Sequence, residues 1–240
     1  MSTADLPDLP VTSSVPVTAP VTAVVVTAGL TPYLSRTLEA LAAQTRRPLQ
    51  VLLVDVGGPA GVADELDRAF ASVPGVRTAR AHIPVRTFGE AVTDGLDRLA
   101  VGGGAPSPWV WLLHDDSAPA PEALAELVRA VNQAPSVVVA GAKQRTWTDP
   151  ERLLEVGVRT TRSGRRVTDV EPGELDQGQH DGRTDVLGVG IAGALVRRDV
   201  WDALGGTDPA LGIFGDGLDL SRRARLAGHR VVVVPGAVVR

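Results

Sequence analysis

The chain has 240 residues, a formal net charge of −4 and no cysteine. This length is sufficient for one sizeable α/β domain with a full hydrophobic core. The absence of cysteine excludes disulfides, zinc–thiolate sites and thiol nucleophiles. The acidic balance leaves no broad basic surface for nucleic acid, so any phosphate binding must be local.

The first 20 residues are rich in Pro, Thr, Ser and Val and lack the basic segment and long apolar core of a signal peptide. We expect residues 1–20 to form a disordered tail. No segment approaches the roughly 20 apolar residues of a membrane-spanning helix, so we expect a soluble, cytoplasmic protein. The sequence stops at Arg240, just after an apolar strand, which suggests a domain cut from a longer protein.

Strand and helix patterns alternate along the first half of the chain. The first helix is expected after Thr31, as its N-cap, and Pro32. Alternation of this kind predicts a doubly wound, mostly parallel sheet flanked by helices. The expected strands are 21–27, 49–54, 76–82, 109–114 and 137–140, and the further helices are 64–71, 88–99 and 121–132.

The second half of the chain has a different character. Residues 143–184 are polar and irregular, and they are too long for an ordinary connection. Such a segment usually shapes a substrate site. A regular pattern returns with strands at 194–198 and 230–234 and helices at 199–204 and 218–227.

Two adjacent acids, Asp115 and Asp116, follow the apolar run that begins at Trp109. The carboxyl ends of such strands are where open α/β sheets bind ligands. Two carboxylates there suit Mg²⁺ or Mn²⁺, ions that are commonly shared with a substrate's phosphates. The alternative is an N-cap for the helix expected near Pro121. Capping explains one acid, but not two acids together with His114.

Asp55 follows the second strand, and Thr27-Ala28-Gly29 follows the first. Both groups are expected at the same sheet edge as Asp115 and Asp116, where carboxylates, a hydroxyl and free N–H groups would suit a nucleotide. In this interpretation Asp55 holds the base or ribose, and the metal holds the phosphates. Alternatively, Asp55 is an Asx-turn residue before Gly57.

The glycines of Gly188-Val-Gly-Ile-Ala-Gly193 match the dinucleotide-binding pattern. That mechanism needs a helix that opens at the third glycine, so that the phosphate meets the helix N-terminus. Here Gly193 leads into a predicted strand. The glycines more plausibly let the backbone approach a ligand or another strand closely.

The final motif surrounds the helix expected at 218–227. Asp216 stands just before this helix, either as an N-cap or as a carboxylate aimed into the site as a general base. Asp219 complements the helix dipole and can pair with Arg222 or Arg223.

In their order and spacing, these motifs resemble the family 2 glycosyltransferases of the GT-A fold, over residues 21–240. The resemblance implies a single GT-A domain from a bacterium, in which residues 21–142 bind the nucleotide and 143–240 face the acceptor. It implies metal-assisted, usually inverting transfer of a sugar from a nucleotide diphosphate to an acceptor hydroxyl, in cell-wall or polysaccharide synthesis. The implied roles are Asp116 for Mg²⁺ or Mn²⁺, Thr27, Ala28, Asp55 and Asp115 for the nucleotide, and Asp216 as base.

The expected partners are a nucleotide-sugar donor and a glycan or lipid-linked acceptor. Nucleic acid is not expected, and membrane association is expected only through segments absent from this chain, which would place the domain at the cytoplasmic face. A nucleotidyltransferase would need a basic phosphate loop after the first strand, and residues 28–31 contain no basic residue.

The sequence departs from the family pattern in two places. His114 occupies the first acidic position of the Asp-x-Asp motif, and Gly217 stands where the usual base, an Asp, is found. Because of the second departure, the alternative function is a non-catalytic domain that binds sugar nucleotides or glycans.

Overall fold

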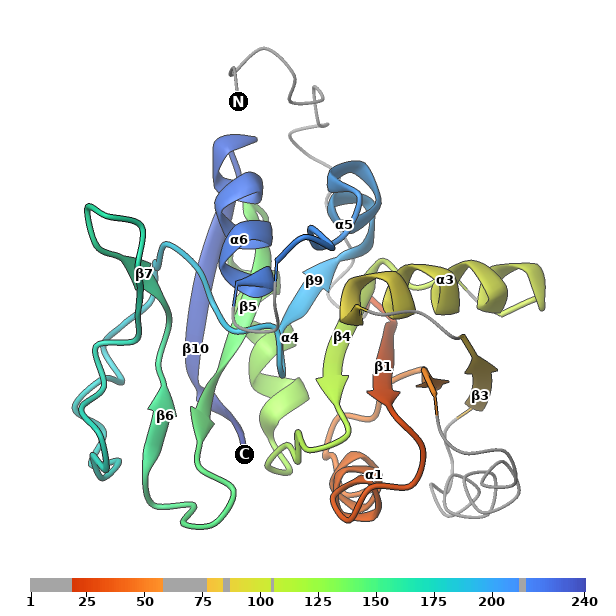
Figure 1. The fold of residues 1–240 in the computed structure, drawn as a ribbon, viewed down its shortest axis with the longest axis horizontal. Coiled ribbons are helices and arrows are strands. Elements are labelled where there is room, and N and C mark those ends of the chain that lie inside the picture. Colours follow the sequence, from red (N-terminus) through yellow and green to blue (C-terminus); the bar gives the residue numbers. More distant parts are fainter. Residues whose placement is uncertain (1–18, 58–76, 84–86, 105, 212–214) are drawn as a thin grey trace.

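The structure is a computed structural model that describes residues 19–57, 77–83, 87–104, 106–211 and 215–240. A mixed sheet with strand order β10-β5-β9-β4-β1-β2-β3 forms its centre, and β6 pairs with β5 beside it (Figure 1). The strands are β1 (Val21–Thr27), β2 (Gln50–Asp55), β3 (Arg77–His82), β4 (Trp109–His114), β5 (Val137–Arg145), β6 (Leu153–Glu155), β9 (Leu195–Arg197) and β10 (Arg230–Val239), with a separate hairpin of β7 (Arg159–Thr160) and β8 (Arg166–Val167). The helices are α1 (Leu34–Ala42), α3 (Phe88–Val101), α4 (Ala123–Gln133), α5 (Arg198–Leu204) and α6 (Asp216–Leu226).

The sheet is mostly parallel, as the alternation predicted. Strand β1 pairs in parallel with β2 and β4, β2 with β3, and β10 with β5. Strand β9 is antiparallel to both of its neighbours, β4 and β5. The carboxyl ends of β2, β1 and β4 therefore meet at one edge of the sheet, which is the lower edge in Figure 1.

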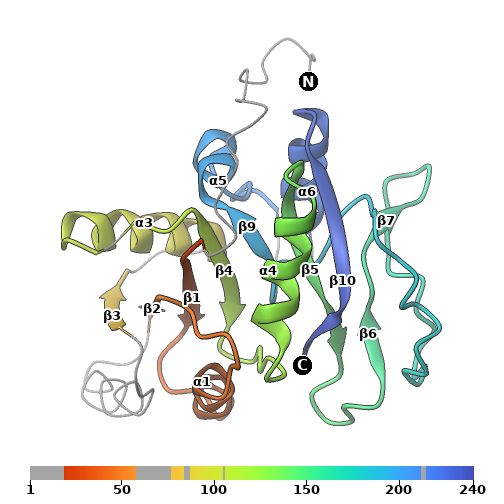
Figure 2. The ribbon, with the colours of Figure 1, turned by 180° about the vertical axis from the view of Figure 1, so that it is seen from behind.

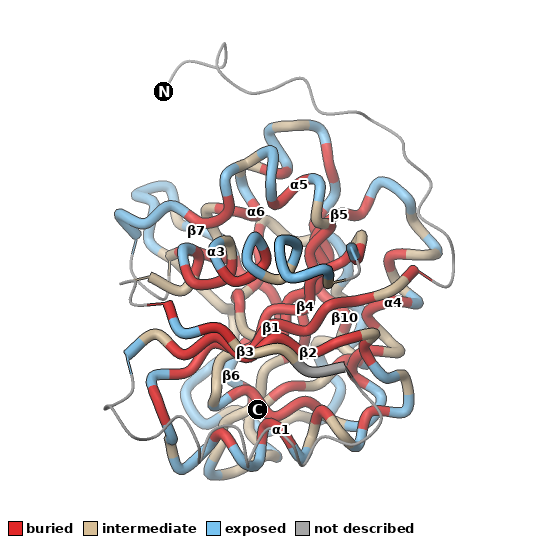
Figure 3. The backbone as a smooth tube through the Cα atoms, turned by 90° about the vertical axis from the view of Figure 1, so that its right-hand side faces the viewer, coloured by how far each residue is buried: buried red, intermediate tan, exposed pale blue. Residues whose placement is uncertain are grey.

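Helices cover both faces of the sheet. Helices α1 and α4 pack on one face, and α3, α5 and α6 on the other (Figures 1 and 2). This division follows from the strands, whose side chains alternate between faces: Val25 packs with α1 and α4, and Val24 packs with the opposite helices. The central strands are consequently buried along their length, while the outer sides of the helices are exposed (Figure 3).

One expectation for secondary structure needs correction. The segment 143–184 is less irregular than predicted, because β5 continues through Arg145 and the segment also contains β6 and the β7–β8 hairpin. Buried Lys143 donates to Asp176 (3.0 Å) and ties this segment to the main sheet, a contact between distant residues that periodicity does not show. The helix predicted at 64–71 and residues 1–18 of the predicted tail lie outside the described residues.

The helix starts also differ from the predictions. Helix α1 begins at Leu34 with Tyr33 as its N-cap, and Thr31 does not cap it. Helix α6 begins at Asp216, two residues earlier than expected. Within the described part of the chain, no helix is both long and apolar enough to cross a bilayer.

Candidate active site

Three predicted site residues meet at the ends of β1, β2 and β4. Thr27 lies opposite Asp55 in the sheet register. Its hydroxyl oxygen is 3.4 Å from a carboxylate oxygen of Asp115 and 2.6 Å from the carbonyl oxygen of Gly29. Ala28, the fourth predicted nucleotide ligand, is exposed in the turn between Thr27 and Gly29. The fold thus brings together groups that are far apart in sequence.

Asp55 orients the loop that follows β1. Its buried carboxylate accepts the N–H of Gly29 (3.0 Å) and the N–H of Gly57 (3.3 Å), and it lies 3.2 Å from Nδ1 of His82. The bond to Gly57 is that of the Asx turn considered as the alternative. The same carboxylate therefore shapes its own turn and holds the neighbouring loop in place.

The N-cap explanation for Asp115 and Asp116 is wrong. Helix α4 has Glu122 at its N-cap position, without a side-chain cap. The N–H of Leu124 instead donates to the side-chain oxygen of buried Gln44 (3.1 Å), just after α1. Asp116 is exposed, and its carboxylate has no hydrogen-bond partner among the described residues. The Asp116 carboxylate is therefore available to bind a ligand.

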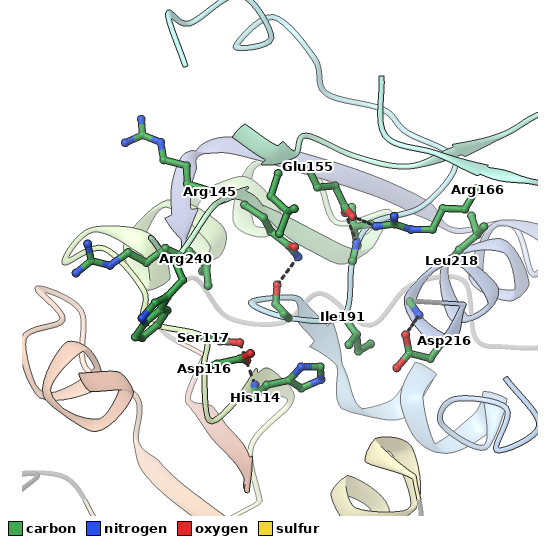
Figure 4. Close-up of a pocket in the computed structure, with 18 residues that line it drawn as sticks. His114, Asp116, Ser117, Arg145, Glu155, Arg166, Ile191, Asp216, Leu218 and Arg240 are labelled. Atoms are coloured by element: carbon green, nitrogen blue, oxygen red, sulfur yellow. Dashed lines mark hydrogen bonds and ion pairs between the residues drawn. The ribbon is translucent and has the colours of Figure 1, made fainter. Parts of the chain in front are cut away.

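Asp116 and Asp216 line one pocket of about 260 Å³. The pocket lies between the end of β4, strands β5 and β6, the loop 188–193 and the start of α6 (Figure 4). The two acids come from opposite halves of the chain. Asp55 is not among the described residues that line this pocket.

Asp216 is the first residue of α6, with Gly215 at the N-cap position, and it does not act as the cap. Its side chain instead lines the pocket, as the second interpretation of this residue requires. The residue is only 5% exposed. Burial raises the pKa of its carboxyl to about 6, although the Gly217 N–H (2.7 Å) and Arg166 oppose the shift. A carboxyl of that pKa is mostly ionised at neutral pH and remains basic enough to take a proton.

Gly217 is explained by a close backbone contact. A Cβ at this position would lie 2.5 Å from the carbonyl oxygen of Val189 and 2.7 Å from the backbone N of Ile191. No side chain fits there unless the loop 188–193 moves. The structure also agrees with the rejection of a dinucleotide site, because Gly193 leads into β9 and no helix opens there.

The sequence did not reveal a part-buried ion pair that supports this loop. Glu155, from β6, is 1% exposed, pairs with Arg166 from β8 and accepts the N–H of Gly190 (Figure 4). Burial raises the pKa of Glu155, and Arg166 and the Gly190 N–H counteract that rise. The pair holds the backbone against which Gly217 packs. No local pattern could indicate this arrangement, since Glu155, Arg166 and Gly190 come from three separate segments.

His114 forms part of the pocket beside Asp116. Its ring makes an edge-to-face contact with the Phe88 ring, with the ring centroids 4.4 Å apart, and its backbone N–H donates to the side-chain oxygen of Ser117 (3.1 Å). Burial lowers the pKa of His114, and the neighbouring Asp116 and Asp115 only partly oppose this. The ring is therefore neutral at pH 7, so it adds no positive charge to the site.

The family model described as "Glycosyltransferase like family 2" matches residues 19–240. The chain belongs to this family. The match covers the whole predicted domain and confirms the resemblance seen in the motifs. No curated protein sequence matches the chain significantly.

Solved structures of glycosyltransferases share the fold. GalNAc-T7 with UDP, GalNAc and Mn²⁺ matches with a TM-score of 0.70 at 16% identity, over 92% of this chain and 43% of that one. The mannosyltransferase PcManGT from Pyrobaculum calidifontis, in complex with GDP-Man and Mn²⁺, has a TM-score of 0.64 at 19% identity, over 96% of this chain and 59% of its own. S. aureus TarS 1-349 has a TM-score of 0.58 at 11% identity, over 91% and 60%. The family 2 chain therefore spans 43% to 60% of the lengths of these proteins and has the predicted GT-A fold.

Proposed function

We propose that the protein transfers a sugar from a nucleotide diphosphate to an acceptor hydroxyl, with the help of a divalent ion and with inversion at the sugar. The observation that carries this proposal is the pocket that Asp116 and Asp216 share at the carboxyl edge of the sheet. Family membership supports sugar transfer. The neighbours bound to UDP or GDP-Man together with Mn²⁺ support a nucleotide-sugar donor and this class of ion.

The residues of the pocket fit Mg²⁺ or Mn²⁺. Asp116 supplies an exposed carboxylate without a partner among the described residues. In the described part of the chain, no three His, Asp or Glu residues are grouped closely enough to hold an ion by themselves. Mg²⁺ commonly takes one or two carboxylates and completes its shell with phosphates and water, which matches a site with Asp116 as its protein ligand. When bound, the ion would offset the negative charge of the departing diphosphate. The chain has a net charge of −4, so it has no broad positive surface that could do this in place of the ion.

The ends of β1, β2 and β4 would hold the nucleotide. Thr27, Ala28 and Asp115 present a hydroxyl, backbone groups and a carboxylate at one edge, and Asp55 fixes the loop that carries them. In this assignment the nucleoside lies over β1 and β2, and the diphosphate reaches toward Asp116.

Asp216 would act as the general base. Its carboxylate takes the proton of the acceptor hydroxyl as the oxygen attacks the sugar carbon, and the bond from that carbon to the diphosphate breaks. Attack from the side opposite the diphosphate inverts the configuration. The N–H of Gly217 orients the carboxylate, and the Glu155–Arg166 pair steadies the adjoining loop. The acceptor would be a glycan or a lipid-linked saccharide, and a nucleotide-sugar donor accords with a cytoplasmic site.

Calorimetry with UDP and with GDP, each in Mn²⁺ and in EDTA, tests the proposed metal site. We expect Mn²⁺ to raise nucleotide affinity in the wild type, and Asp116→Ala to abolish that effect. Asp94→Ala is the matched control, because Asp94 is an exposed carboxylate on α3 outside the pocket. Equal affinity in EDTA and Mn²⁺ would contradict the metal assignment. Binding without transfer or hydrolysis of any nucleotide sugar would favour the non-catalytic domain.

A further inference from the structure

The chain contains few aromatic residues, and two that are accessible lie next to the candidate site: Tyr33 is exposed and Trp147 is partly buried. It has four Trp, one Tyr and three Phe. Trp109, Trp111 and Trp201 are at most 3% exposed. Trp147, in contrast, is only partly buried and lines the pocket with Asp116 and Asp216. Tyr33, beside it, is 41% exposed. Two of the accessible aromatic side chains among the described residues therefore lie together beside the pocket.

Three separate segments build this cluster. Tyr33 precedes α1, Trp147 follows β5, and Arg240 follows β10. The rings of Tyr33 and Trp147 meet edge to face, with centroids 5.1 Å apart and an interplanar angle of 83°. The guanidinium of Arg240 lies 6.0 Å from the centroid of the Trp147 ring. Contacts of both kinds are attractive and hold the rings in defined positions. We call these three side chains the aromatic platform.

The polar groups of the platform are available for a ligand. Two buried tryptophans use their indole N–H within the protein: Trp111 donates to Gly193 (3.2 Å) and Trp201 to Thr93 (3.2 Å). The indole N–H of Trp147 and the hydroxyl of Tyr33 have no hydrogen-bond partner among the described residues. An aromatic surface with free hydrogen-bond donors matches a molecule that has both C–H faces and hydroxyls, as a sugar ring does.

The position of the platform favours the acceptor over the nucleobase. Trp147 lines the pocket that contains Asp216, the proposed base. Thr27 and Asp55, the proposed nucleoside ligands, are not among the described residues that line this pocket. We propose that Tyr33, Trp147 and Arg240 form an acceptor subsite that binds a sugar ring, so that the acceptor is a saccharide. This inference rests on the proposed function.

Saccharide binding in the presence of UDP and Mn²⁺ tests the subsite. The probe is a glycan array of hexose, N-acetylhexosamine, deoxyhexose, pentose and uronate oligosaccharides, followed by calorimetry of the binders. We expect Trp147→Ala to weaken saccharide binding by about tenfold or more and to leave UDP affinity unchanged. Trp147→Phe should restore most of the binding. Leu226→Ala is the control, because Leu226 is 54% exposed on α6 and lines no part of this pocket.

The acceptor subsite and the donor site can be disproved separately. If UDP binds with Mn²⁺ but no saccharide on the array binds the wild type, the subsite is wrong and the donor site stands. If Trp147→Ala weakens UDP as much as saccharide, the platform stacks the nucleobase and the inference is overturned. If neither UDP nor GDP binds, the proposed function itself fails.

Discussion

Replacing Asp216 by Asn keeps the size of the side chain and an oxygen for the Gly217 N–H, but removes the capacity to take a proton. A general base contributes about 10²–10⁴-fold to the rate, so we expect Asp216→Asn to lower the transfer rate by that factor. Donor affinity should change little, because the proposed donor ligands are other residues. The assay is nucleotide release in the presence of acceptor, with donor affinity measured by calorimetry.

The raised pKa of Asp216 also predicts the pH dependence of the wild type. With a pKa of about 6, the carboxylate is mostly ionised at pH 7 and mostly protonated at pH 5. Since only the ionised form is a base, kcat/KM should fall by about tenfold between these pH values. The residual activity of Asp216→Asn should lack this step.

The raised pKa of Asp216 also predicts how protein stability depends on pH. Its contribution to stability falls as pH rises, whereas activity falls as pH drops. The pKa of Asp216 is about 6 in the folded protein and about 3.9 in an unfolded chain, a difference worth up to about 3 kcal/mol. The folded state therefore binds the proton more tightly, and this stability is present below pH 4 and lost as pH rises through 6. Asp216→Asn avoids the loss. We expect the variant to be more stable than the wild type at pH 8, and the two to converge near pH 4, as measured by urea unfolding.

Asp219→Asn is the control for both measurements, because Asp219 lies in the same helical turn and pairs with Arg223 (2.6 Å) outside the pocket. Its transfer rate and pH profile should resemble those of the wild type. If Asp216→Asn transfers sugar at the wild-type rate, or if its stability follows the wild type at every pH, Asp216 is not a buried base.

Three other changes test the surrounding structure. Gly217→Asp restores the family's usual acid, but its side chain should clash with Val189 and lower the free energy of unfolding by about 1–3 kcal/mol, as measured by urea unfolding. A gain of activity without a loss of stability would contradict the close contact at Gly217. Gln44→Ala removes the side-chain bonds that join α1 to α4 and should cost about 1–3 kcal/mol of unfolding free energy, whereas an unchanged thermal midpoint would show that water replaces them. Burial and nearby Arg197 lower the pKa of His229 in the folded protein. As pH drops below about 6.5, His229 is protonated more readily in the unfolded chain, so the free energy of unfolding falls. His229→Gln should lose less stability than the wild type between pH 7.5 and 5.5, and equal losses would rule out this role for His229.

The sequence alone determined the alternation of strands and helices in the first half of the chain and the edge of the sheet where the site lies. Apolar runs predicted β1 with its observed bounds, and strand ends placed Thr27, Asp55 and Asp115 at one edge. This worked because side-chain periodicity is local and because parallel strands bring their carboxyl ends together. The family motifs, read in order, were specific enough to identify the family.

Tertiary structure decided what each site residue touches. Only the packing of α6 on the loop 188–193 shows why residue 217 is glycine and that Asp216 lies inside the pocket. The Glu155–Arg166 pair and the Gln44 contact with α4 join residues distant in sequence, and neither produces a local pattern. Burial, which sets the pKa of Asp216, likewise depends on every segment that covers the side chain. Such contacts and their electrostatics exist only once the chain has folded.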